Sequence, residues 1–308
     1  MNKRDRFLAA IEGEWVDRPP RTCWTHFSTE TLGGDEHAAR QLVFQKEYDW
    51  DICKLVNDFQ YPFPDGVEMI NGPDDMDKFE PASMDSYFFR EELKSVQRVI
   101  EAVGADTPVI MTVFDPLRQV TRLAGVKSLE VIAEHPQAAK RMLDAVGDSM
   151  CRYMEALRGI GCDGIYFAVN SAMLPPAIWC RDDDFYNLLM KPYELAMLEA
   201  AKGMQRFMHV HGTAVTLDRH KNYPVEVITV SDRLAGNPNL EEVREQVSCC
   251  IMGGVNEAEF ALMTPAELRG QMDDALDRYR EKFILAPGCT IPVWSPARQI
   301  QTLATYRR

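Results

Sequence analysis

Phe207-Met208-His209-Val210-His211-Gly212-Thr213 is the stretch of this chain that decides both the fold and the candidate chemistry. Its apolar residues predict a strand from Arg206 to His211. Side chains alternate between the two faces of a strand, so His209 and His211 point the same way and could bind one metal ion. Zinc takes nitrogen and sulfur ligands, and a catalytic zinc usually has three protein ligands and one open position. Cys289, which follows another apolar run, could be the third ligand; alternatively, the histidines form hydrogen bonds in a core and Cys289 packs as a small apolar residue.

Eight apolar runs of strand length occur along the 308 residues, and helical patterns separate most of them. No tight hairpin joins these runs, which is typical of a parallel sheet. Eight strands in a chain of this length favour a closed (β/α)8 TIM barrel of the α/β class, built from residues 1–308 as a single domain. A doubly wound open sheet is the alternative, although neither a Gly-x-Gly-x-x-Gly motif after the first strand nor a phosphate loop is present. The expected strands are Arg21 to Phe27, Asp51 to Val56, Pro108 to Phe114, Asp163 to Val169, Arg206 to His211, Val225 to Val230, Val247 to Met252 and Phe283 to Ala286.

Helix signals fall between these runs. We expect an N-terminal helix over Arg4 to Ile11 and a short helix from Asn239, with Glu242 three residues on as a capping box. Thr264-Pro265-Ala266-Glu267 has the cap residue, the proline and the glutamate of a strong helix start. Pro136 should divide the helical pattern of residues 128–157. Residues 60–84 are rich in Pro, Gly and Asp and predict a long irregular excursion.

Composition excludes several classes of partner. The net charge is -13, and phosphate backbones and anionic membranes both attract basic surfaces, so neither a nucleic acid nor a membrane is expected. The pattern predicts neither a secretory signal nor a membrane-spanning stretch. The eight cysteines include no Cys-x-x-Cys motif, which suits reduced thiols in a cytoplasmic protein. A small molecule or a protein surface is the expected partner.

Polar side chains follow most of the predicted strands, at the edge where barrel enzymes place their chemistry. Asp115 and Asp232 could orient a substrate or cap a turn, and Asn170 could bind a carbonyl or form a turn. Trp24 and His26 could both line a pocket. Alternatively, Trp24 packs in the core and His26 lies at the surface. His37, His135 and His220 are expected to be exposed. The complete set of residues at the strand ends is His26, Asn57, Asp58, Asp115, Asn170, His209, His211, Asp232, Asn256 and Cys289.

An ordered set of short motifs across nearly the whole chain resembles the uroporphyrinogen decarboxylase superfamily, and within it the corrinoid-linked methyltransferases. These motifs are Arg4-Asp5-Arg6-Phe7-Leu8-Ala9-Ala10-Ile11, Asp17-Arg18-Pro19, Lys191-Pro192-Tyr193, His209-x-His211-Gly212, Gly253-Gly254-Val255-Asn256, Thr264-Pro265-Ala266-Glu267 and Phe283 to Pro292. The resemblance implies a (β/α)8 barrel and aligns Asp58 with the catalytic aspartate of the decarboxylase. That enzyme carries an arginine-bearing stretch after its first strand. Here the stretch is Thr22-Cys23-Trp24-Thr25-His26-Phe27, without arginine, which argues against uroporphyrinogen as the substrate.

The methyltransferases carry a zinc motif, His-x-Cys followed much later by Cys, which is similar to His209, His211 and Cys289 with one substitution. The resemblance therefore implies Zn²⁺ on these three residues, a small thiol or related acceptor, and a methylated corrinoid carried by a partner protein. Histidine in place of the middle cysteine leaves the site more positive by one unit. Asp58 and Asp115 are the expected catalytic residues, and Trp24, His26, Asn57, Asn170, Asp232 and Asn256 the expected substrate-binding residues.

Three functions remain open at this point. The first is zinc-dependent methyl transfer between a corrinoid carrier and a thiol or related acceptor. The second is a decarboxylase or lyase that acts on a smaller substrate, with Asp58 and the histidines as acid, base or anion-binding groups. The third is a non-catalytic protein that binds a corrinoid or tetrapyrrole.

Overall fold

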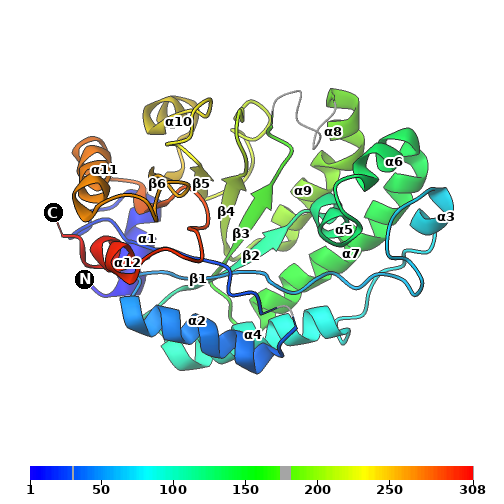
Figure 1. Ribbon diagram of the computed structural model, residues 1–308, viewed down its shortest axis with the longest axis horizontal. Helices are drawn as coiled ribbons and strands as arrows, with labels where there is room; N and C mark the ends of the chain where they lie inside the picture. The colour runs from blue at the N-terminus through cyan, green and yellow to red at the C-terminus, as the bar shows by residue number, and fades with distance from the viewer. Residues whose placement is uncertain (30, 174–181, 308) are drawn as a thin grey trace.

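The computed structural model describes residues 1–29, 31–173 and 182–307, and its centre is a curled sheet of seven parallel strands (Figure 1). The strands pair in chain order, each with the next one along the chain. Because all are parallel, their carboxyl ends lie at one edge of the sheet. The strands are Cys53–Leu55 (β1), Val109–Phe114 (β2), Gly164–Val169 (β3), Gln205–Val210 (β4), Val227–Val230 (β5), Cys250–Val255 (β6) and Phe283–Pro287 (β7).

The first of the eight expected strands, Arg21 to Phe27, is not formed, so the closed eight-stranded barrel is observed only in part. Arg21 makes a single parallel bridge with Leu285 of β7, and its carbonyl oxygen accepts a hydrogen bond from Asp51 N at 3.0 Å. Pro19 and Pro20 have no N–H to donate to a ladder. The segment therefore touches both ends of the sheet without becoming a strand.

The remaining seven expected strands are present. One of them is displaced along the chain, because β6 is Cys250–Val255 whereas we expected Val247 to Met252. Gly253 and Gly254 continue the ladder, opposite Leu285 and Ala286 of β7. The two glycines, which suggest a strand end in the sequence, lie inside the strand in the structure.

Helices surround the outer face of the sheet (Figure 1). The capping boxes predicted at Asn239 and Thr264 are both formed, and the helix of residues 128–157 is divided at Pro136 as expected. The short helix that follows Asp115 and Pro116 was not predicted. The helices are Lys3–Glu12 (α1), Gly34–Tyr48 (α2), Pro73–Met76 (α3), Tyr87–Val103 (α4), Pro116–Ala124 (α5), Ser128–Glu134 (α6), Pro136–Gly159 (α7), Asp183–Leu189 (α8), Lys191–Ala200 (α9), Leu240–Gln246 (α10), Pro265–Arg278 (α11) and Ala297–Thr305 (α12).

Two apolar cores hold these elements together. The larger core lies between the sheet and the helices, and it includes the buried methionines of α7. The smaller one contains residues from the strands together with Phe7 and Ile11 of α1. The rings of Phe7 and Phe207 are nearly parallel, with centroids 6.0 Å apart. Helix α1 thus packs against the start of β4, at the edge of the sheet opposite the strand ends that carry the candidate site.

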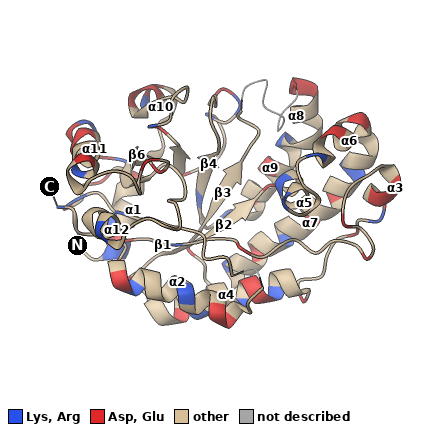
Figure 2. Ribbon diagram, viewed as in Figure 1, with Lys and Arg blue, Asp and Glu red and all other residues tan. Residues whose placement is uncertain are grey.

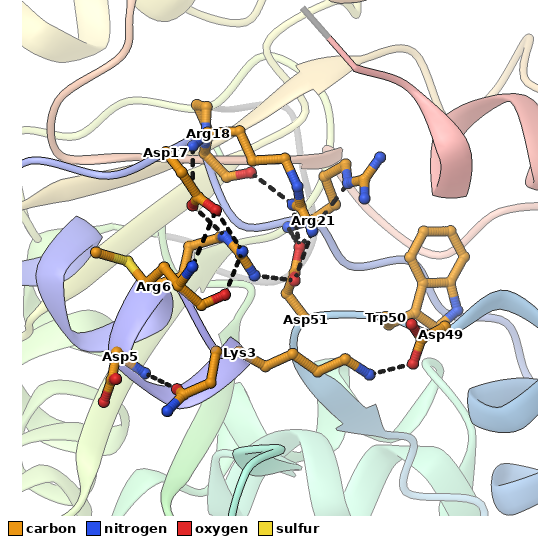
Figure 3. A network of polar contacts seen from close by, with 12 residues as sticks. Lys3, Asp5, Arg6, Asp17, Arg18, Arg21, Asp49, Trp50 and Asp51 are labelled. Carbon is orange, nitrogen blue, oxygen red and sulfur yellow. Dashed lines mark hydrogen bonds and ion pairs between the residues drawn. The ribbon is translucent and has the colours of Figure 1, made fainter.

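Charged side chains lie mainly on the helices rather than on the strands (Figure 2). A network of them joins α1, the following segment and the start of β1 (Figure 3). The Asp51 carboxylate, which is almost fully buried, accepts hydrogen bonds from Arg6 Nη1 at 2.9 Å, Arg18 Nη1 at 2.5 Å and Arg21 N at 2.8 Å. Asp17 accepts from Arg6 Nε at 2.7 Å. The charged residues of the N-terminal motifs therefore stabilise the fold at a distance from the strand ends.

In the part of the chain that the structure describes, no helix combines the length and the apolarity needed to span a bilayer. The seven cysteines described there are all free thiols.

Candidate metal centre

His209, His211 and Cys289 lie together at the carboxyl edge of the sheet. Their ligand atoms are all within 4.8 Å of one another. His209 Nε2 lies 3.1 Å from His211 Nδ1, and Cys289 Sγ lies 3.7 Å from the same nitrogen. Among the described residues, this is the one such group of three His, Cys, Asp or Glu side chains. The juxtaposition expected from the His-x-His pattern and the eighth apolar run is therefore confirmed.

The strands place these ligands through ordinary backbone pairing. His209 lies in β4, and His211 is the first residue after this strand. The backbone N–H of His211 donates to Val169 O of β3 at 3.0 Å. Cys289 follows β7 after Gly288. A Cβ atom at position 288 would lie 2.6 Å from Ser231 Cα, so a glycine is required where this turn approaches the end of β5.

Two of the three distances between the ligand atoms, 3.1 Å and 3.7 Å, are close to those around a zinc ion. Zinc bonds of about 2.0–2.1 Å to nitrogen and about 2.3 Å to sulfur in a tetrahedron separate two nitrogens by about 3.3 Å and nitrogen from sulfur by about 3.6 Å. Burial lowers the pKa of His209 and His211, which favours the neutral imidazole that binds metals. Burial, and then the charge of Glu257, raises the pKa of Cys289 to about 11. A cation would therefore have to displace the thiol proton when it binds.

A layer of aromatic residues beneath the ligands holds a buried lysine. The ring of Tyr166 stacks on His209, with centroids 5.2 Å apart, and Trp24 meets Tyr166 edge to face. Lys54 Nζ lies 4.0 Å from the centroids of both Trp24 and Tyr166, and it donates to Thr112 Oγ1 at 2.9 Å. Lys54 was not predicted as a site residue, although a lysine inside an apolar strand was a signal. Trp24 takes a packing position in this layer.

Glu257 is a second residue that the sequence analysis missed. It is buried beside the turn that carries Cys289, and a Cβ atom at Gly288 would lie 3.0 Å from its Oε2. Burial raises the pKa of its carboxyl group. Its only signal in the sequence was its place directly after Asn256, at the end of β6.

His26 and Asp58 form a pair at the same edge of the sheet. His26 Nδ1 lies 2.8 Å from Asp58 Oδ1, and Thr29 Oγ1 donates to Asp58 Oδ2 at 2.8 Å. Asn57 is buried next to this pair, and its side-chain oxygen accepts from Arg122 Nη1 at 2.7 Å. Two expected site residues are thus in direct contact, and a third is fixed beside them.

The remaining expected residues have local structural partners. Asp115 caps α5 by accepting from Arg118 N at 2.9 Å, and burial, followed by the charge of Glu194, raises its pKa to about 7. Asn170 accepts a backbone hydrogen bond from Met173 N in the turn after β3.

Asp232 and Asn256 are also engaged away from the three ligands. Asp232 accepts from Gly254 N at 2.9 Å and lines a depression of about 160 Å³ with residues of α10 and α11, on the helix side of the sheet. Asn256 accepts from Glu259 N at 3.1 Å. Neither residue is brought into the group of ligands.

Two histidines expected to be exposed are buried, which corrects the sequence analysis. His37 Nδ1 lies 2.6 Å from Ser95 Oγ, and His220 Nε2 lies 2.9 Å from Ser171 Oγ. Both partners come from distant parts of the chain. The local sequence therefore carried no sign of them. His135 is partly buried at the junction of α6 and α7.

Comparison with known proteins agrees with this architecture. A methyltransferase from Methanosarcina mazei has 18% identity and a TM-score of 0.73, over 98% of this chain and 97% of that chain. A B12-independent methionine synthase from Shewanella sp. W3-18-1 has a TM-score of 0.56 at 14% identity. A protein from Listeria monocytogenes, described as a putative B12-independent methionine synthase, has a TM-score of 0.53 at 13% identity. They cover 93% and 98% of this chain and 91% and 90% of their own.

No curated protein sequence matches the chain significantly. Residues 61–308, most of its length, match the family described as Uroporphyrinogen decarboxylase (URO-D). The match includes the end of β4 with its two histidines and the turn after β7 with Cys289. The chain therefore belongs to the uroporphyrinogen decarboxylase family.

Proposed function

We propose that this protein is a zinc-dependent methyltransferase that moves a methyl group between a corrinoid, carried by a partner protein, and a small thiol or related acceptor. His209, His211 and Cys289 would hold the zinc ion and leave one position for the acceptor. The observation that carries the proposal is the convergence of these three ligand atoms within 4.8 Å. The protein would act in the cytoplasm, as a single domain, on a small molecule.

The names of the structural neighbours support methyl transfer over the other functions. One is a methyltransferase and two are methionine synthases, and their likeness extends over nearly the whole chain. Identities of 13–18% carry the fold to this chain but not the substrates. The choice of reaction therefore rests on the ligand set, which suits the binding of a thiol.

The chain's own residues would prepare the site in two ways. His209 and His211 are kept neutral by burial, and the stacked ring of Tyr166 orients His209. When bound, zinc would hold the acceptor thiol and lower its pKa. In the transfer, the sulfur electron pair forms the S–C bond, the electron pair of the broken bond stays with the methyl donor, and the thiol proton passes to a base.

Histidine at position 211 changes the balance of charge. Two imidazoles and one thiolate leave the site one unit more positive than one imidazole and two thiolates, which weakens a bound thiolate as a nucleophile. A more positive site also lowers the pKa of a bound thiol further, which favours its deprotonation.

The expected site residues fall into proposed catalytic carboxyl groups and proposed pocket residues. Asp58, paired with His26, and the buried Asp115 remain the proposed catalytic carboxyl groups. Trp24, Asn57 and Asn170 would shape the pocket. Asp232 and Asn256, whose observed contacts are described above, remain proposed substrate-binding residues.

A decarboxylase or lyase on a smaller substrate is the second candidate. It is favoured by membership of the uroporphyrinogen decarboxylase family and by an ionised Asp58 at the strand ends. Activity of this kind would survive exhaustive chelation, whereas the zinc-dependent transfer would not. Corrinoid binding without any turnover would instead support a non-catalytic binding protein.

Metal content and methyl transfer test the proposal together. His211→Ala and Cys289→Ala should each lose the zinc that the wild type binds, and should lose transfer from methylcobalamin to a panel of thiols. The matched controls are His135→Ala and Cys151→Ala, which change the same residue types on the outer helices. Wild-type protein that is purified without chelator and takes up no zinc would refute the proposal.

A further inference from the structure

The backbone that carries His211 lies just beyond the end of the sheet ladder. Strands β4 and β5 are neighbours (Figure 1), and their last pair of residues is Val210 with Val230. His211 follows Val210 directly, and the loops after the two strands begin there. Backbone groups that leave a ladder need other hydrogen-bond partners, so the loop after β4 depends on contacts outside the sheet.

The side-chain amide of Asn237 provides such contacts. Its Nδ2 donates to Gly212 O at 2.9 Å and to Ser231 O at 3.1 Å, and its Oδ1 accepts from Val215 N at 3.2 Å. Both amide hydrogens and the amide oxygen are therefore engaged with the backbone. The opposite orientation would place Oδ1 against two carbonyl oxygens, so these contacts fix the orientation of the amide.

Asn237 is the hydrogen-bonded link between the loops after β4 and β5. In the described part of the chain, the two hydrogen bonds that join residues 212–215 to residues 231–237 both come from this side chain. On the opposite side, a bridge between Met173 and Val215 holds the loop after β4 to the loop after β3. A substitution at Asn237 would therefore release one side of the loop and leave the other side in place.

The loop after β4 also has a backbone conformation that requires support. Ala214 has a φ of 51°, in the left-handed region that residues with a side chain rarely adopt. Such a conformation persists only where surrounding contacts hold it. The hydrogen bonds of Asn237 to Gly212 and Val215 hold the backbone on both sides of Ala214.

The two carbonyl groups that this amide binds lie beside the two turns that carry metal ligands. Gly212 follows His211 directly in the chain. Ser231 packs against the turn of Cys289, because a Cβ atom at Gly288 would lie 2.6 Å from Ser231 Cα. The separation of His211 Nδ1 from Cys289 Sγ, 3.7 Å, thus depends on how closely these loops approach each other.

Resting on the zinc-dependent function proposed above, we infer that Asn237 is a positioning residue of the metal centre. Its side chain sets the distance between the turn that carries His211 and the turn that carries Cys289, and it acts through the backbone of Gly212 and Ser231. Loss of the groups that orient metal ligands typically lowers metal affinity about 10–100-fold. We expect a loss of this size when the amide is removed.

Asn237→Asp tests the inference, because it places an oxygen of similar size against the two carbonyl oxygens in place of the Nδ2 donor. Zinc affinity, measured by competition with a chromophoric chelator, should fall about 10–100-fold. Cobalt(II) bound in place of zinc reports the ligand geometry, and its visible absorption spectrum should change. Asn237→Ala removes the same donors without adding a charge. It should weaken zinc binding as well, and it keeps the test decisive if the first variant does not fold.

Asn239→Asp is the matched control, since it makes the same substitution two residues further along the loop. Asn239 caps α10 through its Oδ1, which accepts from Glu241 N at 2.9 Å and from Glu242 N at 3.1 Å. Aspartate keeps that oxygen and is an equally good cap. This variant should bind zinc and cobalt as the wild type does.

Urea unfolding of the metal-free proteins separates positioning from stability, because a residue that only stabilises the fold would leave the affinity of the folded protein unchanged. Unchanged zinc affinity and an unchanged cobalt spectrum in folded Asn237 variants would overturn the inference and leave the proposed function standing. Wild-type protein that binds no zinc would overturn both.

Discussion

The buried network around Asp51 makes a quantitative prediction about stability. The Asp51 side chain is 1% exposed, and it accepts hydrogen bonds from Arg6, Arg18 and the backbone of Arg21. Asp51→Asn removes the charge that these arginines, of which Arg6 and Arg21 are buried, face. Removal of one partner of a buried ion pair costs about 3–5 kcal/mol, because the other charge is left uncompensated. We expect a loss of this size in the free energy of unfolding, measured by equilibrium denaturation in urea and followed by circular dichroism.

Asp77→Asn is the matched control for this prediction. Asp77 accepts from Arg141 Nη2 at 2.6 Å, a contact as short as those at Asp51, but the two side chains are 47% and 59% exposed. An exposed pair of this kind contributes less than about 1 kcal/mol. High salt should reduce the Asp77 effect more than the Asp51 effect. Equal losses for the two substitutions would refute the argument that burial makes the Asp51 network important for stability.

Three other substitutions test features near the site. Burial raises the pKa of Glu92 to about 8, so the folded protein retains a proton that the unfolded chain loses near pH 4.5. The free energy of unfolding should therefore fall as the pH rises from about 4.5 to about 8. Urea titrations at several pH values should show this fall in the wild type and not in Glu92→Gln. Lys54 has a pKa lowered by burial, so unfolding takes up a proton and wild-type stability should rise from neutral to alkaline pH; a Lys54→Met variant with the same rise would contradict this. Gly288→Ala should lower the free energy of unfolding by about 1–3 kcal/mol and weaken zinc binding, because the added Cβ would lie 2.6 Å from Ser231 Cα. Gly270→Ala is the control, because its Cβ would meet no atom within 4 Å. It should not destabilise the protein or change its zinc content.

Most of the fold was predictable because its signals are local. Apolar runs marked seven strands, and the caps at Asn239 and Thr264 marked two helix starts. The failures have physical causes. In the first expected strand only Arg21 forms a bridge, to Leu285, and the ladder between β6 and β7 extends through Gly253 and Gly254, which the pattern assigned to a strand end. The helix after Asp115 was missed although its cap and first-turn proline were present in the sequence.

The candidate site was predictable where strand geometry alone decides it. The two-residue spacing of His209 and His211 and the place of Cys289 after the last strand were enough to bring the three together. Contacts between distant segments were not predictable. The burial of His37 and His220, the contact of His26 with Asp58, and the position of Lys54 between two aromatic rings all depend on partners that only the folded chain supplies.

The metal content of the purified protein tests the central claim most directly. Protein purified without chelator and analysed by elemental mass spectrometry should contain about one zinc ion per chain, as expected for a single three-ligand site. His211→Ala and Cys289→Ala should contain almost none, while His135→Ala and Cys151→Ala should match the wild type. Wild-type protein without zinc, or zinc that persists in both ligand variants, would contradict the assignment of His209, His211 and Cys289 as a metal centre.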